Sequence, residues 1–101
     1  MQIEVLHVAG CPHLHATVAL VRQVAVAYGI VPDLQCMEIG SEEEACRARF
    51  LGSPTVRVDG QDIEPEARTR TDFGLSCRLY GRTGTPPRQL IEAALIGSGL
   101  P

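Results

Sequence analysis

The chain of 101 residues contains no lysine and no tryptophan, and only 4% of its residues are aromatic. With so few rings available, a core must be built mainly from valine, leucine, isoleucine and alanine. The glycines are scattered and no lysine is present to complete a phosphate-binding loop, which excludes that motif. The formal net charge of −3 gives nucleic acid and anionic membranes no electrostatic reason to bind.

Long apolar runs are also missing. Glu4 and His7 interrupt the first apolar stretch, so we expect no export signal there. The helix expected next carries His13, His15 and Arg22, which argues against a membrane-spanning segment. The resulting expectation is a cytoplasmic protein without membrane contact. The four cysteines are then expected to be free thiols rather than a disulfide framework.

Length and composition fit one folded domain. Hydrophobic residues make up 45% and charged residues 21%, and residues 1–101 suffice for a single compact core. Apolar periodicity and turn residues predict strands over 3–8, 32–39, 55–58 and 61–64, and helices over 11–28, 41–51 and 85–97. The order β-α-β-α-β-β-α predicts an α/β fold in which a four-stranded mixed sheet carries helices on both faces.

Two short motifs support these boundaries. Ser41 followed by Glu44 forms a capping box at the start of the second helix. Asp59-Gly60 is a two-residue hairpin signal. Between the hairpin and the last helix, residues 65–84 show no periodicity. A loop of this length inside a compact domain is uncommon and is often functional.

Cys11 lies where the first strand turns into the first helix. Pro12 suits the first helical position, where its missing N–H would have no intrahelical partner. Unpaired N–H groups at a helix start favour negative charge, which lowers the pKa of a thiol and makes it more nucleophilic. The alternative is a buried cysteine that packs as a small hydrophobic residue. The placement between Gly10 and Pro12 favours the reactive thiol.

Two motifs carry a resemblance to a known family. The run Gly10-Cys11-Pro12-His13-Leu14 resembles the active-site turn of thioredoxin-like proteins. The run Gly52-Ser53-Pro54-Thr55 is similar to the loop in which that fold places a cis proline against the active-site thiol. The resemblance covers the element order of nearly the whole chain and implies a thioredoxin-like fold of glutaredoxin size. It further implies that Cys11 is the nucleophilic thiol and Pro54 the cis proline.

The resemblance also implies a substrate-binding surface around the thiol. The backbone of Ser53 would be the edge that pairs with an extended thiol substrate, and Pro12, His13 and Thr55 would lie beside it. The implied activity is that of a thiol–disulfide oxidoreductase. Its partner would be a thiol or disulfide, carried by a protein or a small molecule, and no cofactor is expected.

The sequence departs from the family pattern at one position. Redox-active members usually carry a second cysteine three residues after the first, and Leu14 occupies that position here. A single thiol forms a mixed disulfide but cannot close the local ring that releases the product. Cys77 is the candidate resolving thiol, and the charge of the neighbouring Arg78 would favour its thiolate and a bound substrate. An external thiol, or no resolving thiol at all, is the alternative.

The stretch 73–80 around Cys77 resembles a feature of a small bacterial subgroup of thioredoxin-like proteins, some of which are labelled alkylmercury lyases. Two other functions therefore stay open. Cys11 and Cys77 would hold a soft metal ion or an organomercurial in the first. In the second, the domain binds a partner and has lost redox chemistry. Only His7 and His15 would add ligands for a tetrahedral zinc ion, and we expect no bound metal.

The remaining cysteines are expected to be structural. Cys36 falls on the second strand and Cys46 on the second helix, and both are predicted to lie in the core, as is His7. Val24 and Val26 widen the apolar face of the first helix beyond what one sheet needs. That wide face favours a homodimer.

Overall fold

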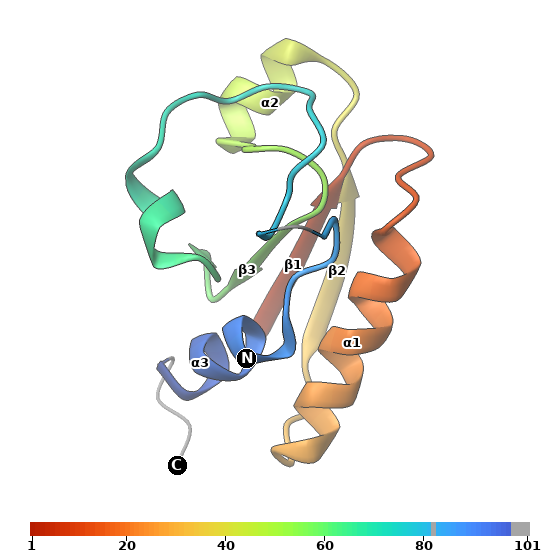
Figure 1. Ribbon diagram of the computed structural model, residues 1–101, viewed down its shortest axis with the longest axis vertical. Helices are drawn as coiled ribbons and strands as arrows, with labels where there is room; N and C mark the ends of the chain where they lie inside the picture. Colours follow the sequence, from red (N-terminus) through yellow and green to blue (C-terminus); the bar gives the residue numbers. More distant parts are fainter. Residues whose placement is uncertain (82, 98–101) are drawn as a thin grey trace.

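The computed structural model describes residues 1–81 and 83–97 (Figure 1). One mixed sheet is formed by β1 (Gln2–His7), β2 (Asp33–Glu38), β3 (Thr55–Val58) and β4 (Gln61–Asp62). Its order is β2-β1-β3-β4, with β1 parallel to β2 and antiparallel to β3. The helices are α1 (Leu14–Ala27), α2 (Glu42–Ala48), the 3-10 helix η1 (Pro65–Thr69) and α3 (Arg88–Gly97). The predicted small α/β fold with a four-stranded mixed sheet is confirmed.

Alternation along the strands divides the core in two. Ile3 and Val5 of β1 face α1 and α3, whereas Leu6 points to the opposite face. The larger cluster joins the sheet to the two long helices through Ile3, Val5, Val21, Val24, Val56, Val58, Ile63, Tyr80, Ile91 and Leu95. The smaller cluster lies under α2 and consists of Leu6, Ile39, Ala45 and Phe50. The larger cluster covers one face of the sheet, whereas the smaller cluster covers the opposite face only around Leu6, and β2 is largely exposed. The predicted coverage of both faces is thus observed in part.

The two local motifs adopt the geometry that their residues favour. The Ser41 hydroxyl accepts from the Glu44 N–H at 3.1 Å, and the Glu44 carboxylate accepts from the Gly40 N–H at 3.3 Å. The second bond reaches one residue further back than in a standard capping box. Asp59 and Gly60 have φ of 49° and 83°, so the β3–β4 connection is a turn with two left-handed residues. Both predictions are confirmed.

Helix α2 is shorter than predicted. It ends at Ala48, and Arg49 adopts a left-handed conformation with φ of 55°. The guanidinium of Arg57 donates to the carbonyls of Ala48 and Arg49 at 2.6 and 2.8 Å. These contacts satisfy carbonyls that a helix end leaves without an intrahelical partner. The helix thus stops before Gly52, which we expected to end it.

The predicted loop 65–84 is not structureless where it is described. It contains η1, an isolated bridge between Ser53 and Cys77, and a second bridge between Tyr80 and Thr83. In Figure 1 the segment that follows η1 passes across the end of the sheet and then descends beside β1 toward α3. No helix in the described part of the chain is long and apolar enough to cross a membrane.

The prediction that Cys36 and Cys46 lie in the core is wrong, because both are exposed. Cys36 belongs to β2, which is an edge strand with only one neighbour. Cys46 lies on α2, of which only Ala45 is buried. His7 is half-buried, with its ring Nδ1 atom 3.0 Å from the carbonyl of Val8.

Candidate functional site

Cys11 lies in a tight turn between β1 and α1. Gly10 takes a φ of +69°, the Cys11 N–H donates to the Val8 carbonyl at 3.3 Å, and the Leu14 N–H donates to the Cys11 carbonyl at 3.3 Å. Helix α1 begins at Leu14, so Cys11 precedes the first helical residue by three positions. Pro12 therefore lies in the turn, which corrects our prediction that it occupies the first helical position.

The Cys11 thiol is half-exposed and free. Pro12 beside it is exposed, and His13 is half-buried as the residue that precedes α1. The imidazole of His13 lies directly against Gly84, so closely that a methyl group at position 84 would overlap the ring. His13 is thus held by the segment before α3, whereas His15, two residues further along the chain, is exposed.

The loop before β3 contacts the Cys11 turn through Ser53. The Ser53–Pro54 peptide bond is cis, as the resemblance implied for Pro54. The Ser53 hydroxyl accepts from the Val8 N–H at 3.1 Å, and Val8 is also the residue whose carbonyl binds Cys11. One serine therefore joins the cis-proline loop to the backbone of the thiol turn.

The same serine is paired with the segment that carries Cys77. The Ser53 N–H donates to the Ser76 carbonyl at 2.8 Å, and the Arg78 N–H donates to the Ser53 carbonyl at 2.9 Å. These two bonds form a short parallel bridge between Ser53 and Cys77. The backbone edge that we expected to bind an extended substrate is thus occupied by the chain itself.

This pairing requires glycine at position 52. Gly52 has a φ of +118°, which side-chain-bearing residues rarely adopt. A Cβ atom there would lie 3.0 Å from the Ser76 hydroxyl and 3.1 Å from Cβ of Arg78. The absence of a side chain at Gly52 lets the two segments approach.

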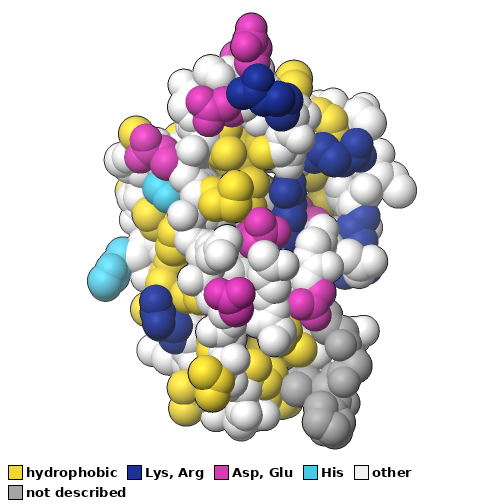
Figure 2. Space-filling view, turned by 180° about the vertical axis from the view of Figure 1, so that it is seen from behind, with side chains coloured by type: hydrophobic (Ala, Val, Ile, Leu, Met, Phe, Trp, Pro, Cys, Tyr) yellow, Lys and Arg dark blue, Asp and Glu magenta, His cyan; other side chains and the backbone are white. Residues whose placement is uncertain are grey.

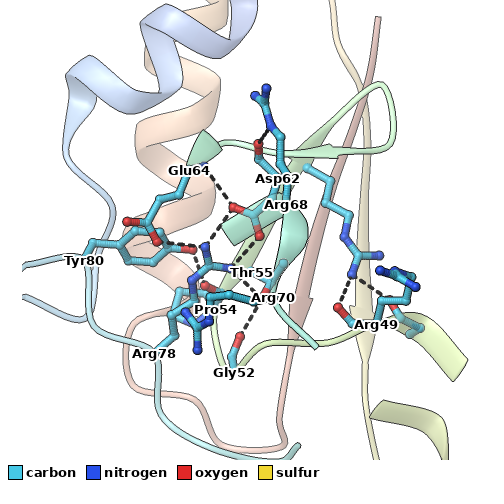
Figure 3. A network of polar contacts seen from close by, with 12 residues as sticks. Arg49, Gly52, Pro54, Thr55, Asp62, Glu64, Arg68, Arg70, Arg78 and Tyr80 are labelled. Carbon is cyan, nitrogen blue, oxygen red and sulfur yellow. Dashed lines mark hydrogen bonds and ion pairs between the residues drawn. The ribbon is translucent and has the colours of Figure 1, made fainter. Parts of the chain in front are cut away.

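Cys77 and Arg78 point to opposite sides of their extended segment, as neighbours in such segments do. Cys77 is exposed, whereas Arg78 is 4% exposed. The guanidinium of Arg78 binds both carboxylate oxygens of Asp62, at 2.7 and 2.8 Å, and the Glu64 carboxylate at 2.8 Å (Figure 3). It also donates to the Thr55 hydroxyl at 3.1 Å. We expected the charge of Arg78 to favour the Cys77 thiolate and a bound substrate. Instead, the carboxylates of Asp62 and Glu64 neutralise this charge.

Electrostatics and burial strengthen the contacts of Arg78 with Asp62, Glu64 and Thr55, which we call the Arg78 clamp. Burial lowers the pKa of the Arg78 guanidinium, but the hydrogen bonds and charge of Asp62 and the Glu64 contact outweigh it and hold the pKa above its usual value. The carbon of the guanidinium lies 4.7 Å from the centre of the Tyr80 ring, a cation–π contact. The Tyr80 hydroxyl donates to the Pro54 carbonyl at 2.6 Å, and burial raises the pKa of that hydroxyl. Residues 78 and 80 thus fix the Cys77 segment to the cis-proline loop.

Thr55 has no surface to offer a substrate. Its side chain is fully buried, and its hydroxyl donates to the Gly52 carbonyl at 2.6 Å while it accepts from Arg78. The family resemblance implied that Thr55 lies in the substrate-binding surface, and the structure corrects this prediction. Its hydroxyl instead turns inward to the buried guanidinium, so it positions the loop.

Sequence reasoning missed Asp62, Glu64 and Tyr80. Asp62 and Glu64 are two residues apart in the returning arm of the hairpin, a spacing that places both side chains on one side of an extended segment. Two acidic side chains on one side of a segment indicate a cation that binds both, and the sequence shows this pattern at Asp62 and Glu64. Nothing local to the sequence identifies Arg78 as the cation.

Within residues 1–81 and 83–97, no three side chains of histidine, cysteine, aspartate or glutamate converge in a way that could hold a metal ion. Hydrogen bonds therefore join the Cys11 turn to Ser53 through Val8, and join Ser53 to the segment that carries Cys77. The His7 ring also lies against the Val8 carbonyl, whereas His15 is exposed. Comparison with protein-family models, with curated proteins and with solved structures finds no match to this chain.

Proposed function

We propose that this chain is a thioredoxin-like thiol protein that carries out thiol–disulfide exchange through Cys11, with Cys77 or an external thiol as the resolving group. The β-α-β-α-β-β-α order, the mixed sheet and the cis bond before Pro54 support the thioredoxin-like interpretation. The half-exposed thiol in the β1–α1 turn supports Cys11 as the attacking group.

The observation that carries the proposal is that Ser53 is hydrogen-bonded to both of the segments that contain Cys11 and Cys77. Its hydroxyl binds Val8 in the Cys11 turn, and its backbone N–H and carbonyl bind the residues on either side of Cys77. A residue that pairs with this edge is held next to the thiol turn. Here that residue is Cys77, which is exposed and free.

Two thiols of the protein are sufficient to reduce one substrate disulfide. The Cys11 thiolate attacks one sulfur of a substrate disulfide, which forms a mixed disulfide and releases the other sulfur as a thiolate that takes up a proton. The Cys77 thiolate then attacks the Cys11 sulfur, forms the Cys11–Cys77 disulfide and releases the second substrate thiol. The substrate gains two electrons and the protein loses two. A low-molecular-weight thiol or a dithiol reductase returns the protein to its reduced form.

The modification of Cys11 and that of Cys77 can be measured separately by mass spectrometry of tryptic peptides. The chain has no lysine, so trypsin cleaves only after arginine. Cys11 falls in peptide 1–22, Cys77 in peptide 71–78, and the two other cysteines together in peptide 23–47. We expect the reduced protein, treated with a small disulfide at limiting concentration, to yield peptide 1–22 cross-linked to peptide 71–78. Cys77→Ser should stop at the mixed disulfide on peptide 1–22, and Cys46→Ser should behave as the wild type.

Two outcomes separate the alternatives. If Cys11 oxidises while peptide 71–78 stays unlinked in the wild type, an external thiol resolves the exchange and the internal pairing is wrong. If Cys11 reacts with the disulfide no faster than the two exposed cysteines of peptide 23–47, the exchange function itself is wrong. A partner-binding domain without redox chemistry would then be the better interpretation.

A second candidate function rests on the same two free thiols. Thiolates bind soft metal ions and organomercurials, and Cys11 and Cys77 are both accessible and joined through Ser53. Calorimetric titration with Cd²⁺, a soft ion that binds more than one thiolate, would test it. A shared site predicts one equivalent bound tightly in the wild type and in Cys46→Ser, but weakly in Cys77→Ser. Equal binding by all three proteins would exclude a shared site.

A further inference from the structure

A second feature lies away from the thiols, where four of the nine arginines line one cavity. The cavity has a volume of about 280 Å³ and is bounded by the end of α2, the β3–β4 hairpin and η1. Its arginines are Arg49, Arg57, Arg68 and Arg70. In Figure 2 basic side chains gather on the upper right part of the surface, whereas acidic ones are spread over the whole face. Such a concentration of positive charge is unexpected on a chain with a net charge of −3.

Asp62, the acidic residue in the lining of the cavity, does not neutralise the positive charge of the four arginines. Asp62 is 7% exposed, and both of its carboxylate oxygens are bound by Arg78 behind the cavity wall. Within the described part of the chain, Arg70 alone among the four arginines forms an ion pair with a carboxylate, that of the exposed Asp72 at 2.6 Å. The guanidinium groups of Arg49, Arg57 and Arg68 have no acid partner among the described residues, and this charge is open to an anion.

Backbone carbonyls hold two of these guanidinium groups in place. Arg57 is fixed by its bonds to the end of α2, and Arg68 donates through Nε to the Asp62 carbonyl at 2.9 Å (Figure 3). Each guanidinium has five N–H donors, so most of them stay unused. Burial lowers the pKa of Arg57, the charges of Glu4 and Asp62 raise it, and the charges of Arg78 and Arg49 lower it again. An anion in the cavity would offset the repulsion between Arg57 and Arg49.

The backbone conformation of Arg49 also points to a binding role for its side chain. It occupies the left-handed position after α2, where glycine is the residue without a steric penalty. Its guanidinium carbon lies 5.1 Å from the centre of the Phe73 ring, and Phe73 also lines the cavity. A cation–π contact uses the face of the guanidinium and leaves its in-plane N–H groups available. The fold thus keeps a strained arginine where glycine would be easier, with its donors at the cavity.

From this arrangement we propose that the cavity binds the phosphate group of a small phosphorylated molecule. The planar N–H forks of several arginines match the paired oxygens of phosphate, and the charge they gather suits a dianion. Phe73, Leu51 and Ala67 provide an apolar wall for a short organic group. The volume of about 280 Å³ lies just below the usual range for small-molecule pockets, about 300–1,000 Å³, so the ligand must be small.

Calorimetric titration at fixed ionic strength tests the site with two probes, inorganic phosphate and phenyl phosphate. We expect saturable binding of at least one probe to the wild type. Tighter binding of phenyl phosphate would identify a phosphate ester as the ligand, and equal or tighter binding of inorganic phosphate would identify the free ion. Absence of saturable binding of either probe up to about 10 mM would overturn the proposal, since such a Kd is weaker than a specific site provides.

Variants connect the binding to the arginines. Arg49→Gln and Arg68→Gln should each weaken binding about tenfold or more, because each removes a charged hydrogen-bond donor. Arg47→Gln is the matched control: it removes the same charge from α2, two residues from Arg49, and Arg47 is exposed and outside the lining. An equal loss in the control would mean that net charge alone drives binding, and would also overturn the proposal.

Arg49→Gly separates binding from folding. Glycine suits a φ of 55°, so the melting temperature of this variant should be at least that of the wild type in the absence of phosphate. Its affinity for the phosphate probe should fall as in Arg49→Gln. If Arg49→Gly binds the probe as well as the wild type, the Arg49 side chain has no part in the site.

Discussion

Arg78 and the arginines of the cavity lie on two sides of Asp62 and show two ways in which a guanidinium is held. Arg78 is buried, and it is surrounded by two carboxylates, a hydroxyl and an aromatic ring. Arg57 and Arg68 are held by backbone carbonyls, which orient a guanidinium without cancelling its charge. The comparison shows that the hydrogen-bond acceptor determines the role of an arginine. A carboxylate neutralises the guanidinium and makes it structural, whereas a backbone carbonyl leaves its charge available for a ligand.

The largest effect is expected when the clamp is broken. Arg78→Met leaves the carboxylates of Asp62 and Glu64 without their cation, and Asp62 is buried. Removing one partner of a buried ion pair costs about 3–5 kcal/mol, so the free energy of unfolding in urea should fall by that amount. The Cys77 segment should also loosen, and its alkylation should become faster.

Arg70→Met is the matched control for that change, because it removes the same charge with the same replacement. The Arg70–Asp72 pair is exposed, with side-chain exposures of 45% and 65%, and exposed pairs contribute little. Similar losses in the two variants would show that the buried network is not a special contribution to stability.

A smaller effect is expected at Tyr80. Tyr80→Phe removes the hydroxyl that donates to the buried Pro54 carbonyl and leaves that carbonyl without this partner. The loss in unfolding free energy should be about 1–2 kcal/mol, typical of a buried acceptor that loses its donor. Tyr28→Phe is the control, because the Tyr28 hydroxyl bonds to Glu92 at the surface and its loss should change stability little. A loss at Tyr28 equal to that at Tyr80 would contradict the anchoring role of Tyr80.

The smallest effect concerns a single proton. The hydrogen bonds from Arg70 hold the pKa of the Asp72 carboxyl below its usual value. A carboxyl with a lowered folded-state pKa stabilises the fold above its unfolded pKa, and this contribution is lost as the pH falls through the folded value. Arg70→Gln should therefore raise the pKa of Asp72 toward that of a free aspartate, as followed by NMR titration of the side-chain carboxyl. An unchanged pKa would mean that the ion pair does not persist in solution.

Features with a local cause could be predicted from the sequence. Ser41 with Glu44 and Asp59 with Gly60 act within a few residues of themselves, so their geometry follows from their own chemistry. The alternation of Val56 and Val58 likewise placed β3 at its observed bounds. The cis bond before Pro54 came from the family resemblance, since nothing local to the residues required it.

Features that depend on long-range topology could not be predicted. The prediction that Cys36 lies in the core rested on free cysteine being among the most buried residue types, but burial depends on whether a strand lies in the middle or at the edge of the sheet. Arg78 meets Asp62 and Glu64 across 16 and 14 residues, along a path with no periodic pattern. The arginine cavity has the same origin, since its members come from a helix end, a strand and the segment that follows.

The contact between His13 and Gly84 has a consequence for how this chain can change through evolution. Any side chain at position 84 would overlap the imidazole, so the two positions share one volume at the thiol turn. In descendants of this sequence, glycine should persist at position 84 wherever a ring occupies position 13. A larger residue at 84 should appear only together with a small residue at 13. The pair should thus covary, although 71 positions separate its members in the chain.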